Sequence, residues 1–140
     1  MLTTLFLSLG LAANIKLTDL ECAIWQVESG KKLTGDKPIL GDWCPRRKRF
    51  MSRGPLQISE DYHTDSGVKF PYHMVDDLEH AVLTMRGFMK RYAREDRKPA
   101  GMSWNEMKAR MHNGGPRGHW RIEATQQHWE KTQKALADCN

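Results

Sequence analysis

The sequence predicts a single, mostly α-helical domain of about five helices, with at most a small β element between residues 31 and 53. Two Ser/Thr-x-x-Glu capping boxes, at residues 18–21 and 103–106, each precede an apolar stripe with helical spacing. A third stripe repeats every 3.6 residues between residues 78 and 92. No repeat or flexible linker divides the 140 residues, a length typical of one domain.

The composition excludes several classes of protein. The 39% hydrophobic and 28% charged residues are ordinary for a globular chain, which argues against a collagen, a low-complexity chain and a polytopic membrane protein. Five Trp, four Phe and eight Met are too much apolar surface for a disordered chain to leave in water. The formal net charge of +5 suits a polyanionic partner such as nucleic acid, an acidic membrane face or an anionic cell wall.

The first residues have the pattern of an export signal. Residues 2–13 are apolar and end in small residues, although a basic start is missing. This stretch is shorter than the ~20 apolar residues that span a bilayer. We therefore expect a signal peptide over residues 1–13, a folded domain over residues 14–140 and no stable membrane insertion. The alternative is an ordinary N-terminal helix packed on the domain.

The three cysteines, Cys22, Cys44 and Cys139, allow at most one disulfide within the chain. A bond between Cys22 and Cys139 would tie the first helix to the C-terminus. Three unpaired thiols are the alternative. Because one bond is no disulfide framework, the hydrophobic core must stabilise the domain in either case.

The first predicted helix follows Thr18 and ends at Gly30. Its apolar positions share one face: Leu20, Ala23, Ile24 and Val27. Glu28 lies in the last turn, where the negative end of the helix dipole and partial burial each raise the pKa of a carboxyl. An acid is locally unfavourable here, and such inconsistencies tend to mark functional residues.

The next segment, residues 31–53, is expected to form loops or short strands and carries the basic run of residues 46–49. A short helix is predicted to start at Gly54-Pro55 and to include residues 56–58. A turn region is expected to follow, through residues 65–67 and Pro71.

The longest helix is predicted from a cap at Asp76 or Asp77 to about Arg94. Its stripe comprises Leu78, Ala81, Val82, Met85, Met89 and Tyr92. A fourth helix follows the capping box at residues 103–106, with Met107 and Met111 facing inward.

The rest of the chain is predicted to be a loop and a helix. Residues 112–118 contain three Gly and a Pro, which predicts a tight loop rather than a helix. A last helix is predicted over about residues 123–137, with Trp129, Thr132 and Leu136 on one side.

Glu28 and the loop after it offer the acids of a glycosidase. Cleavage of a glycosidic bond needs a protonated carboxyl beside the leaving oxygen and usually a second carboxylate to stabilise or trap the oxocarbenium ion. Asp36 and Asp42 are the nearby acids. By itself this pattern is more typical of surface carboxylates.

Several segments together resemble the invertebrate-type lysozymes, or destabilase group, of the lysozyme and lytic transglycosylase superfamily. The order and spacing match over about residues 20–136. The matching segments are residues 26–30, 54–58, 62 with 65–67, 89–92 and 110–118. Animal members contain many disulfides, whereas this chain allows at most one and has Ser66 at one of their cysteine positions, so it resembles the bacterial branch more.

The resemblance implies a lysozyme-like α+β fold and cleavage of peptidoglycan between N-acetylmuramic acid and N-acetylglucosamine. The family's general acid falls on Glu28. When the family's spacing is counted forward from Glu28, the second catalytic carboxylate falls on Asp42. When it is counted back from Gly54, the same position falls near Arg47. The two counts agree if this chain has an insertion around residues 43–51. Destabilase isopeptidase activity is not inferred, because Ser59 replaces the expected Lys.

The saccharide cleft is expected to involve polar and glycine residues from three segments. These are Ser52, Gly54, Gln57, Tyr62, His112, Asn113, Gly114 and Gly115. Three aromatic residues are candidates for stacking on sugar rings, or equally for partial burial in the core: Trp43, Tyr62 and Trp120.

No metal or other cofactor is expected, because no ligand pattern such as His-Glu-x-x-His or Cys-x-x-Cys occurs. Five histidines are expected at the surface or in loops: His63, His73, His80, His119 and His128.

The sequence thus predicts a secreted or periplasmic, bacteriolytic monomer that acts on peptidoglycan or chito-oligosaccharides. The alternatives are a lytic transglycosylase that uses one Glu and a non-catalytic glycan-binding protein. Nucleic-acid binding through residues 46–49 is disfavoured, because no recognition helix or aromatic platform accompanies them.

Overall fold

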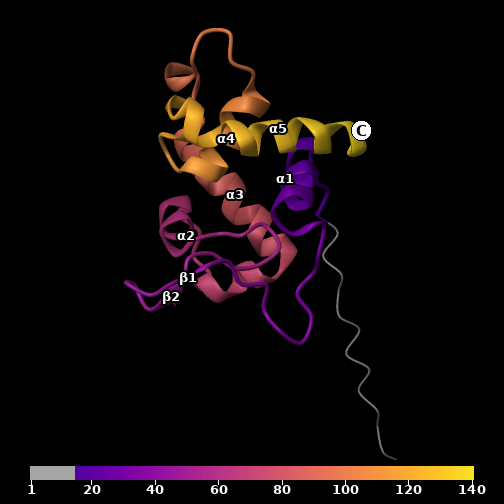
Figure 1. Ribbon diagram of the computed structural model, residues 1–140, viewed down its shortest axis with the longest axis vertical. Helices are drawn as coiled ribbons and strands as arrows, with labels where there is room; N and C mark the ends of the chain where they lie inside the picture. The colour runs from indigo at the N-terminus through magenta and orange to yellow at the C-terminus, as the bar shows by residue number, and fades with distance from the viewer. Residues whose placement is uncertain (1–14) are drawn as a thin grey trace, which may run out of the picture.

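The computed structural model describes residues 15–140, so the predicted signal peptide lies outside the described residues. The described chain contains five α-helices, three short 3-10 helices and one small antiparallel sheet, which confirms the mostly α prediction (Figure 1). The α-helices are α1 (Asp19–Ser29), α2 (Glu60–Ser66), α3 (Leu78–Tyr92), α4 (Trp104–Gly114) and α5 (Ile122–Asp138). The 3-10 helices are η1 (Tyr72–Asp76), η2 (Glu95–Arg97) and η3 (Gly118–Trp120).

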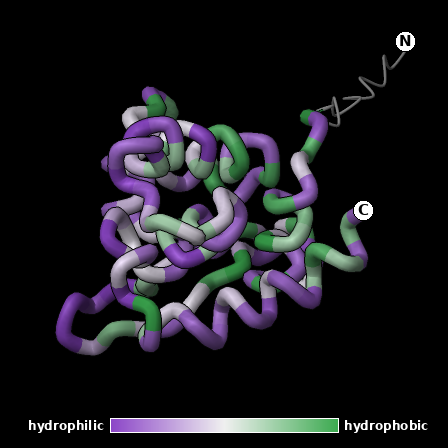
Figure 2. Tube along the Cα trace, turned by 90° about the horizontal axis from the view of Figure 1, so that it is seen from above, coloured by the Kyte–Doolittle hydropathy of each residue, from purple (hydrophilic) through white to green (hydrophobic). Residues whose placement is uncertain are grey.

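The helices form two groups joined by α3. Helix α5 packs against both α1 and α4 at one end of the molecule, and α3 runs from there to the other end, where α2 and the two strands lie (Figure 1). Hydrophilic and apolar residues alternate along the helix that ends at the C-terminus (Figure 2), as expected for a helix with one buried face. Within residues 15–140 no helix combines the length and apolar character needed to cross a membrane.

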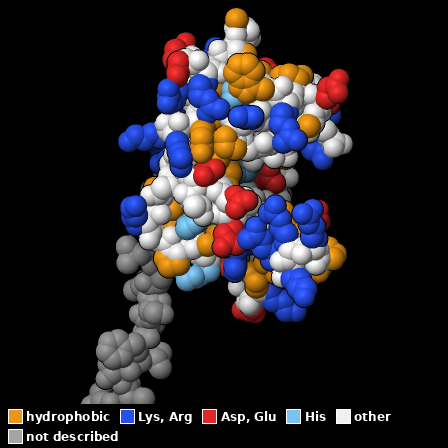
Figure 3. Space-filling model, turned by 90° about the vertical axis from the view of Figure 1, so that its left-hand side faces the viewer, with side chains coloured by type: hydrophobic (Ala, Val, Ile, Leu, Met, Phe, Trp, Pro, Cys, Tyr) orange, Lys and Arg blue, Asp and Glu red, His pale blue; other side chains and the backbone are white. Residues whose placement is uncertain are grey.

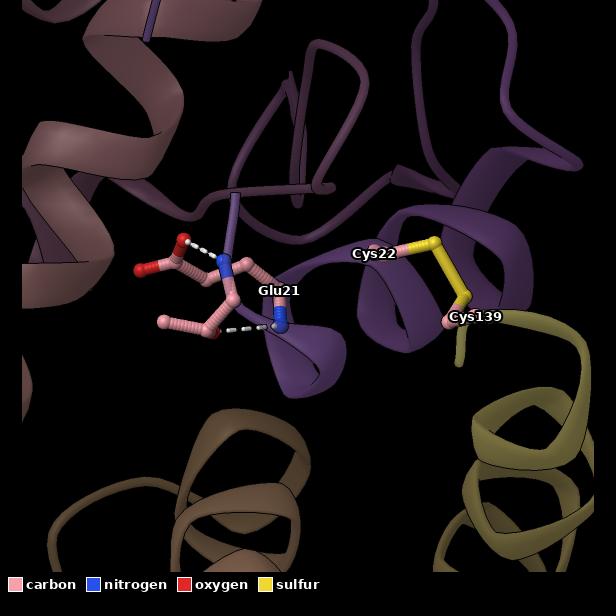
Figure 4. Close-up of a disulfide and its surroundings, with 4 residues drawn as sticks. Glu21, Cys22 and Cys139 are labelled. Carbon is pink, nitrogen blue, oxygen red and sulfur yellow. Dashed lines mark hydrogen bonds between the residues drawn. A yellow bond between two sulfur atoms is a disulfide. The ribbon is translucent and has the colours of Figure 1, made fainter. Parts of the chain in front are cut away.

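Helix α1 begins and ends as predicted. The hydroxyl of Thr18 accepts a hydrogen bond from the backbone N–H of Glu21, and the Glu21 carboxylate accepts one from the backbone N–H of Thr18 (Figure 4). The same buried carboxylate accepts two hydrogen bonds from Arg86 of α3. Gly30 ends the helix with a φ of 66°. Both ends of α1 are thus set by local sequence, and Glu28 lies in its last turn.

A disulfide joins Cys22 of α1 to Cys139 at the end of α5 (Figure 4). The structure therefore confirms the pairing that the sequence allowed, and Cys44 remains a free thiol. The bond links two helices that are far apart in the chain and packed side by side.

The small β element is a hairpin of β1 (Trp43–Cys44) and β2 (Arg49–Phe50). Its register pairs Trp43 with Phe50, and residues 46–48 of the basic run lie in the turn between the strands. Arg49 forms a 2.7 Å ion pair with Glu60 in the first turn of α2. The hairpin occupies the segment in which an insertion was expected.

The prediction that a short helix starts at Gly54 is wrong. Residues 54–57 form a turn closed by an antiparallel bridge between Arg53 and Ile58, with Gln57 at a φ of 51°. A Cβ at Gly54 would clash with the carbonyl of Val75, so this tight approach requires glycine. Helix α2 begins only after Ser59, whose hydroxyl accepts a hydrogen bond from the backbone N–H of Tyr62.

The turn region expected at residues 65–67 also differs, because α2 continues to Ser66. Gly67 then ends the helix at a φ of 74°. Helix α3 begins after Asp77, one of the two caps predicted, and its apolar stripe packs into the core. It has 15 residues and α5 has 17, so α3 is not the longest helix.

Helix α4 begins at its predicted cap and extends beyond its predicted end. Met107 and Met111 are fully buried, as expected. The helix continues to Gly114, so His112 and Asn113 belong to its last turn rather than to a loop. Gly114 is tolerated in the helix because it packs closely on Thr125 of α5, where a Cβ would lie 2.8 Å from the Thr125 methyl.

Candidate active site

A cleft of about 670 Å³ lies between the two groups of helices. Its walls come from α1, the residues that flank the hairpin, the turn before α2, α2 itself, α3 and the end of α4. The lining residues are Glu28, Gly41, Asp42, Met51, Ser52, Gln57, Ser59, Asp61, Tyr62, Asp65, Phe88, His112, Asn113, Gly115 and Pro116. One face of the molecule shows acidic side chains near its middle, flanked by Lys and Arg (Figure 3).

Glu28 is largely buried, with 18% of its side chain exposed. Its Oε1 lies 2.7 Å from Nε2 of His128 and 3.6 Å from Nε2 of His112. An ionised carboxylate only accepts, so in that state Nε2 of His128 donates the hydrogen bond. Burial raises the pKa of Glu28, but the His128 hydrogen bond and the electrostatic effects of the neighbouring His112, His128 and Lys131 outweigh it, so the pKa lies below its ordinary value. The predicted rise in this pKa is therefore wrong, because the partners come from α4 and α5.

His112 is held in one tautomer by two hydrogen bonds. Its Nε2 lies 3.0 Å from the carbonyl oxygen of Leu56, and its Nδ1 lies 3.1 Å from the hydroxyl of Tyr62. A carbonyl only accepts, so Nε2 carries the proton and Nδ1 accepts from Tyr62. Burial lowers the pKa of His112, which favours this neutral form. Burial likewise raises the pKa of Tyr62 well above its ordinary value, so its hydroxyl stays protonated.

Asp42 lines the same cleft as Glu28 from the residue before β1. Its backbone carbonyl accepts a 2.9 Å hydrogen bond from Met51, and the preceding Gly41 donates one of 2.9 Å to Ser52. A side chain at Gly41 would clash with the Ser52 hydroxyl, so glycine is required beside the acid. The acid that the family resemblance placed at Asp42 is thus on the cleft wall, while Asp36 is not among the lining residues.

Two further carboxylates, Asp61 and Asp65 of α2, also line the cleft. Family motifs did not assign a role to either side chain. Asp61 lies 3.9 Å from Arg47 of the hairpin turn, and Asp65 lies 3.8 Å from Arg91 of α3. The cleft is therefore rich in acids although the whole chain carries a net charge of +5.

The predicted saccharide-binding residues divide into two groups. Six line the cleft: Ser52, Gln57, Tyr62, His112, Asn113 and Gly115. The Ser52 hydroxyl donates a 2.8 Å hydrogen bond to Oε1 of Gln57, whose Nε2 donates to the Gly54 carbonyl at 3.0 Å. Gly54 and Gly114 are not among the lining residues, and both have the packing roles described above.

The aromatic candidates are in different environments. Tyr62 is buried and stacks on Phe88 with ring centroids 3.9 Å apart, so it supports the floor of the cleft. Trp43 and Trp120 are exposed, and neither is among the lining residues. Trp43 instead packs edge to face on Phe50 across the hairpin.

The prediction that five histidines lie at the surface or in loops is wrong for His119 and His128, which are 0% and 9% exposed. The role of His128 beside Glu28 was missed. A signal was present, since the buried residues Thr125, His128, Thr132 and Ala135 follow helical spacing and place His128 on the inner face of α5. Among residues 15–140, no group of three or more His, Cys, Asp or Glu has an arrangement suited to a metal ion.

The relatives found by comparison with known proteins are lysozymes, both in sequence and in structure. No family model matches the chain. A lysozyme of Magallana gigas is 34% identical over 130 residues, which cover 91% of this chain and 85% of that protein. The crystal structure of Tapes japonica lysozyme is similar with a TM-score of 0.63 and 30% identity, covering 84% of this chain and 89% of the other. A chain in the complex of Aeromonas hydrophila PliI with Meretrix lusoria lysozyme gives the same TM-score and identity, and covers 84% and 88%.

Proposed function

The chain belongs to the invertebrate-type lysozyme family, and from this we propose that it hydrolyses the β-1,4 bond between N-acetylmuramic acid and N-acetylglucosamine with Glu28 as general acid. Lysozymes are glycosidases that cleave peptidoglycan, and this chain shares that activity. The observation that supports the role of Glu28 is its place in an acidic cleft with Asp42, with Oε1 bonded to His128.

The reaction needs two roles from the two acids. Glu28 protonates the leaving glycosidic oxygen and afterwards takes a proton from the attacking water. Asp42 stabilises the cationic transition state or traps it covalently. Because Glu28 is largely buried, its carboxyl acts in a medium where charge interactions are stronger than in water.

The sugar contacts that we propose come from the polar residues of the cleft wall. Gln57 is fixed by its bonds to Ser52 and Gly54, so its amide is held in one orientation toward the cleft. Asn113, in the last turn of α4, and Gly115, directly after that helix, also line the cleft. Hydroxyl and N-acetyl groups of a glycan supply matching donors and acceptors.

Product analysis tests this function. The full chain is incubated with insoluble peptidoglycan, and the soluble products are analysed by mass. Muropeptides with reducing ends are expected. Anhydro-sugar products would show that the enzyme is a lytic transglycosylase and not a hydrolase, with Glu28 as its single catalytic acid. Wall binding without release would leave only a glycan-binding protein.

An Asp42→Asn substitution is expected to reduce turnover of a soluble chito-oligosaccharide by about 10²- to 10³-fold, the usual cost of removing one group that stabilises charge in the transition state. Asp36→Asn is the matched control, since Asp36 lies in the same loop and is not among the residues that line the cleft. Full turnover by the Asp42→Asn variant would exclude Asp42 as the second acid and favour the single-Glu route.

The basic hairpin turn is expected to increase the rate of attack on the anionic wall. Arg47 and Arg49 pair with Asp61 and Glu60, whereas the exposed Arg46 and Lys48 form no ion pair with a described residue. An Arg46→Gln/Lys48→Gln variant should therefore release muropeptides more slowly than the parent at low salt and equally fast at high salt, because salt screens exposed charges.

Turnover of a neutral chito-oligosaccharide by the hairpin variant should match the parent at every ionic strength. A rate deficit on the wall that does not depend on salt would contradict electrostatic attraction by this turn.

We also propose export to a compartment outside the cytoplasm and a bacteriolytic role there as a monomer. The Cys22–Cys139 disulfide supports this location, because disulfides persist in oxidising compartments. The apolar stretch of residues 2–13 supports it independently.

A further inference from the structure

The two oxygens of the Glu28 carboxyl have different surroundings. Oε1 is bonded to His128 at 2.7 Å and lies near His112. Among residues 15–140 no hydrogen bond reaches Oε2. Because Glu28 lines the cleft and its Oε1 is occupied, Oε2 is the oxygen available to a bound ligand.

The two histidines beside Glu28 also differ from each other. Both ring nitrogens of His112 are committed, one to Leu56 and one to Tyr62. His128 uses only Nε2, in its bond to Glu28, and its buried Nδ1 has no partner among the described residues. An orphaned buried nitrogen is costly, so the position of this ring needs an explanation other than its own hydrogen bonding.

We propose that His128 is a positioning residue for the general acid: its Nε2–H binds Oε1 of Glu28 and thereby keeps the acidic proton on Oε2, toward the substrate. This inference rests on the proposed function of Glu28. A proton on Oε1 would confront the Nε2–H donor, so the carboxylic acid places its proton on the other oxygen. Without His128 the carboxyl is free to rotate, and either oxygen takes the proton.

The groups around the pair determine how His128 affects titration. His112 faces Glu28 from α4 and contacts the hydroxyl of Tyr62 of α2, and Lys131 adds positive charge from α5. The carboxylates Asp42, Asp61 and Asp65 line the same cleft. Replacement of His128 removes its electrostatic stabilisation of the carboxylate, together with the hydrogen bond where the new side chain has no donor, while burial of Glu28 remains. The pKa of Glu28 should then rise.

The sign for activity follows from the role of an acid. A general acid works only while it is protonated, so activity is lost as the pH rises through the pKa of Glu28. Variants without the histidine should therefore keep activity to higher pH than the parent. They should also differ in rate: His128→Gln retains an N–H donor at a similar reach, whereas His128→Leu has none.

The test compares both variants with the parent on a soluble chito-oligosaccharide across pH. His128→Leu is expected to lose about 10²-fold in kcat, the scale of a misplaced catalytic group. The kcat of His128→Gln is expected to lie within about tenfold of that of the parent. In both variants the loss of activity on the alkaline side of the pH profile should occur at higher pH than in the parent. His119→Gln replaces a buried histidine that does not line the cleft, so it should leave the pH profile of activity unchanged.

A second measurement is independent of turnover and of the fate of the leucine variant. Carbon-13 NMR follows the Glu28 carboxyl across pH, with its signal assigned by its absence in Glu28→Gln. A higher midpoint in His128→Gln than in the parent supports the proposal. An unchanged midpoint, or a His128→Leu variant that is folded and as active as His128→Gln, would overturn it. A parent that cleaves no glycan refutes the proposed function instead, and the midpoints still report on the pair.

Discussion

Replacement of Glu28 by glutamine is expected to reduce muropeptide release by about 10²- to 10⁴-fold, the contribution of a general acid. Glutamine has nearly the same shape and keeps an oxygen that accepts the bond from His128, so the helix and the cleft should persist. It carries no transferable proton. The loss should therefore appear in kcat, with binding to the wall retained.

Glu21→Gln is the matched control on the same helix. Glu21 is buried outside the cleft and binds Arg86 and the backbone of Thr18, so its replacement should lower thermal stability and leave turnover per folded molecule near that of the parent. Retained turnover in Glu28→Gln, measured by mass analysis of released sugars, would remove Glu28 from the mechanism.

Replacement of both Cys22 and Cys139 by serine is expected to lower the free energy of unfolding by about 2–5 kcal/mol. The bond closes a loop with a sequence separation of 117 residues, and cross-links over long loops restrict the unfolded chain most. The measurement is denaturant unfolding followed by circular dichroism, with the parent kept oxidised.

Cys44→Ser is the control, because this free thiol lies in the two-residue strand β1. It should change stability by no more than about 0.5 kcal/mol, as is usual for substitutions away from the core. Equal stability of the double variant and the parent would contradict a structural role for the disulfide.

The disulfide also bears on the site. It joins α1, which carries Glu28, to α5, which carries His128. Loss of the bond leaves the packing of these two helices to side-chain contacts alone. The double variant should therefore lose activity at a lower temperature than the parent.

Local signals in the sequence determined most of the helices. The capping residues Thr18 and Ser103 act on backbone groups three positions away, and the stripe of residues 78–92 reports one buried face. These interactions involve neighbours within a few residues, so they can be predicted before the fold is known. The position of Glu28 in the last turn of α1 and the family resemblance were readable in the same way.

The error at Gly54 shows where local reasoning fails. Gly-Pro is a common helix start, but here the chain turns back so that Leu56 and Ile58 are both fully buried. The bridge from Arg53 to Ile58 and the close approach to Val75 decide the conformation. Propensity is a weak preference, and tertiary contacts override it.

The sequence by itself determined which helices form, which residue offers the acid and which family the motifs resemble. Only the tertiary structure decided the state of that acid. His128 is 100 positions from Glu28 in the chain, yet its ring nitrogen lies 2.7 Å from the carboxylate. Local dipole and burial predict a raised pKa, whereas these distant partners lower it. The sign of a pKa shift depends on burial, hydrogen bonds and nearby charges together, and packing determines which groups surround the carboxyl.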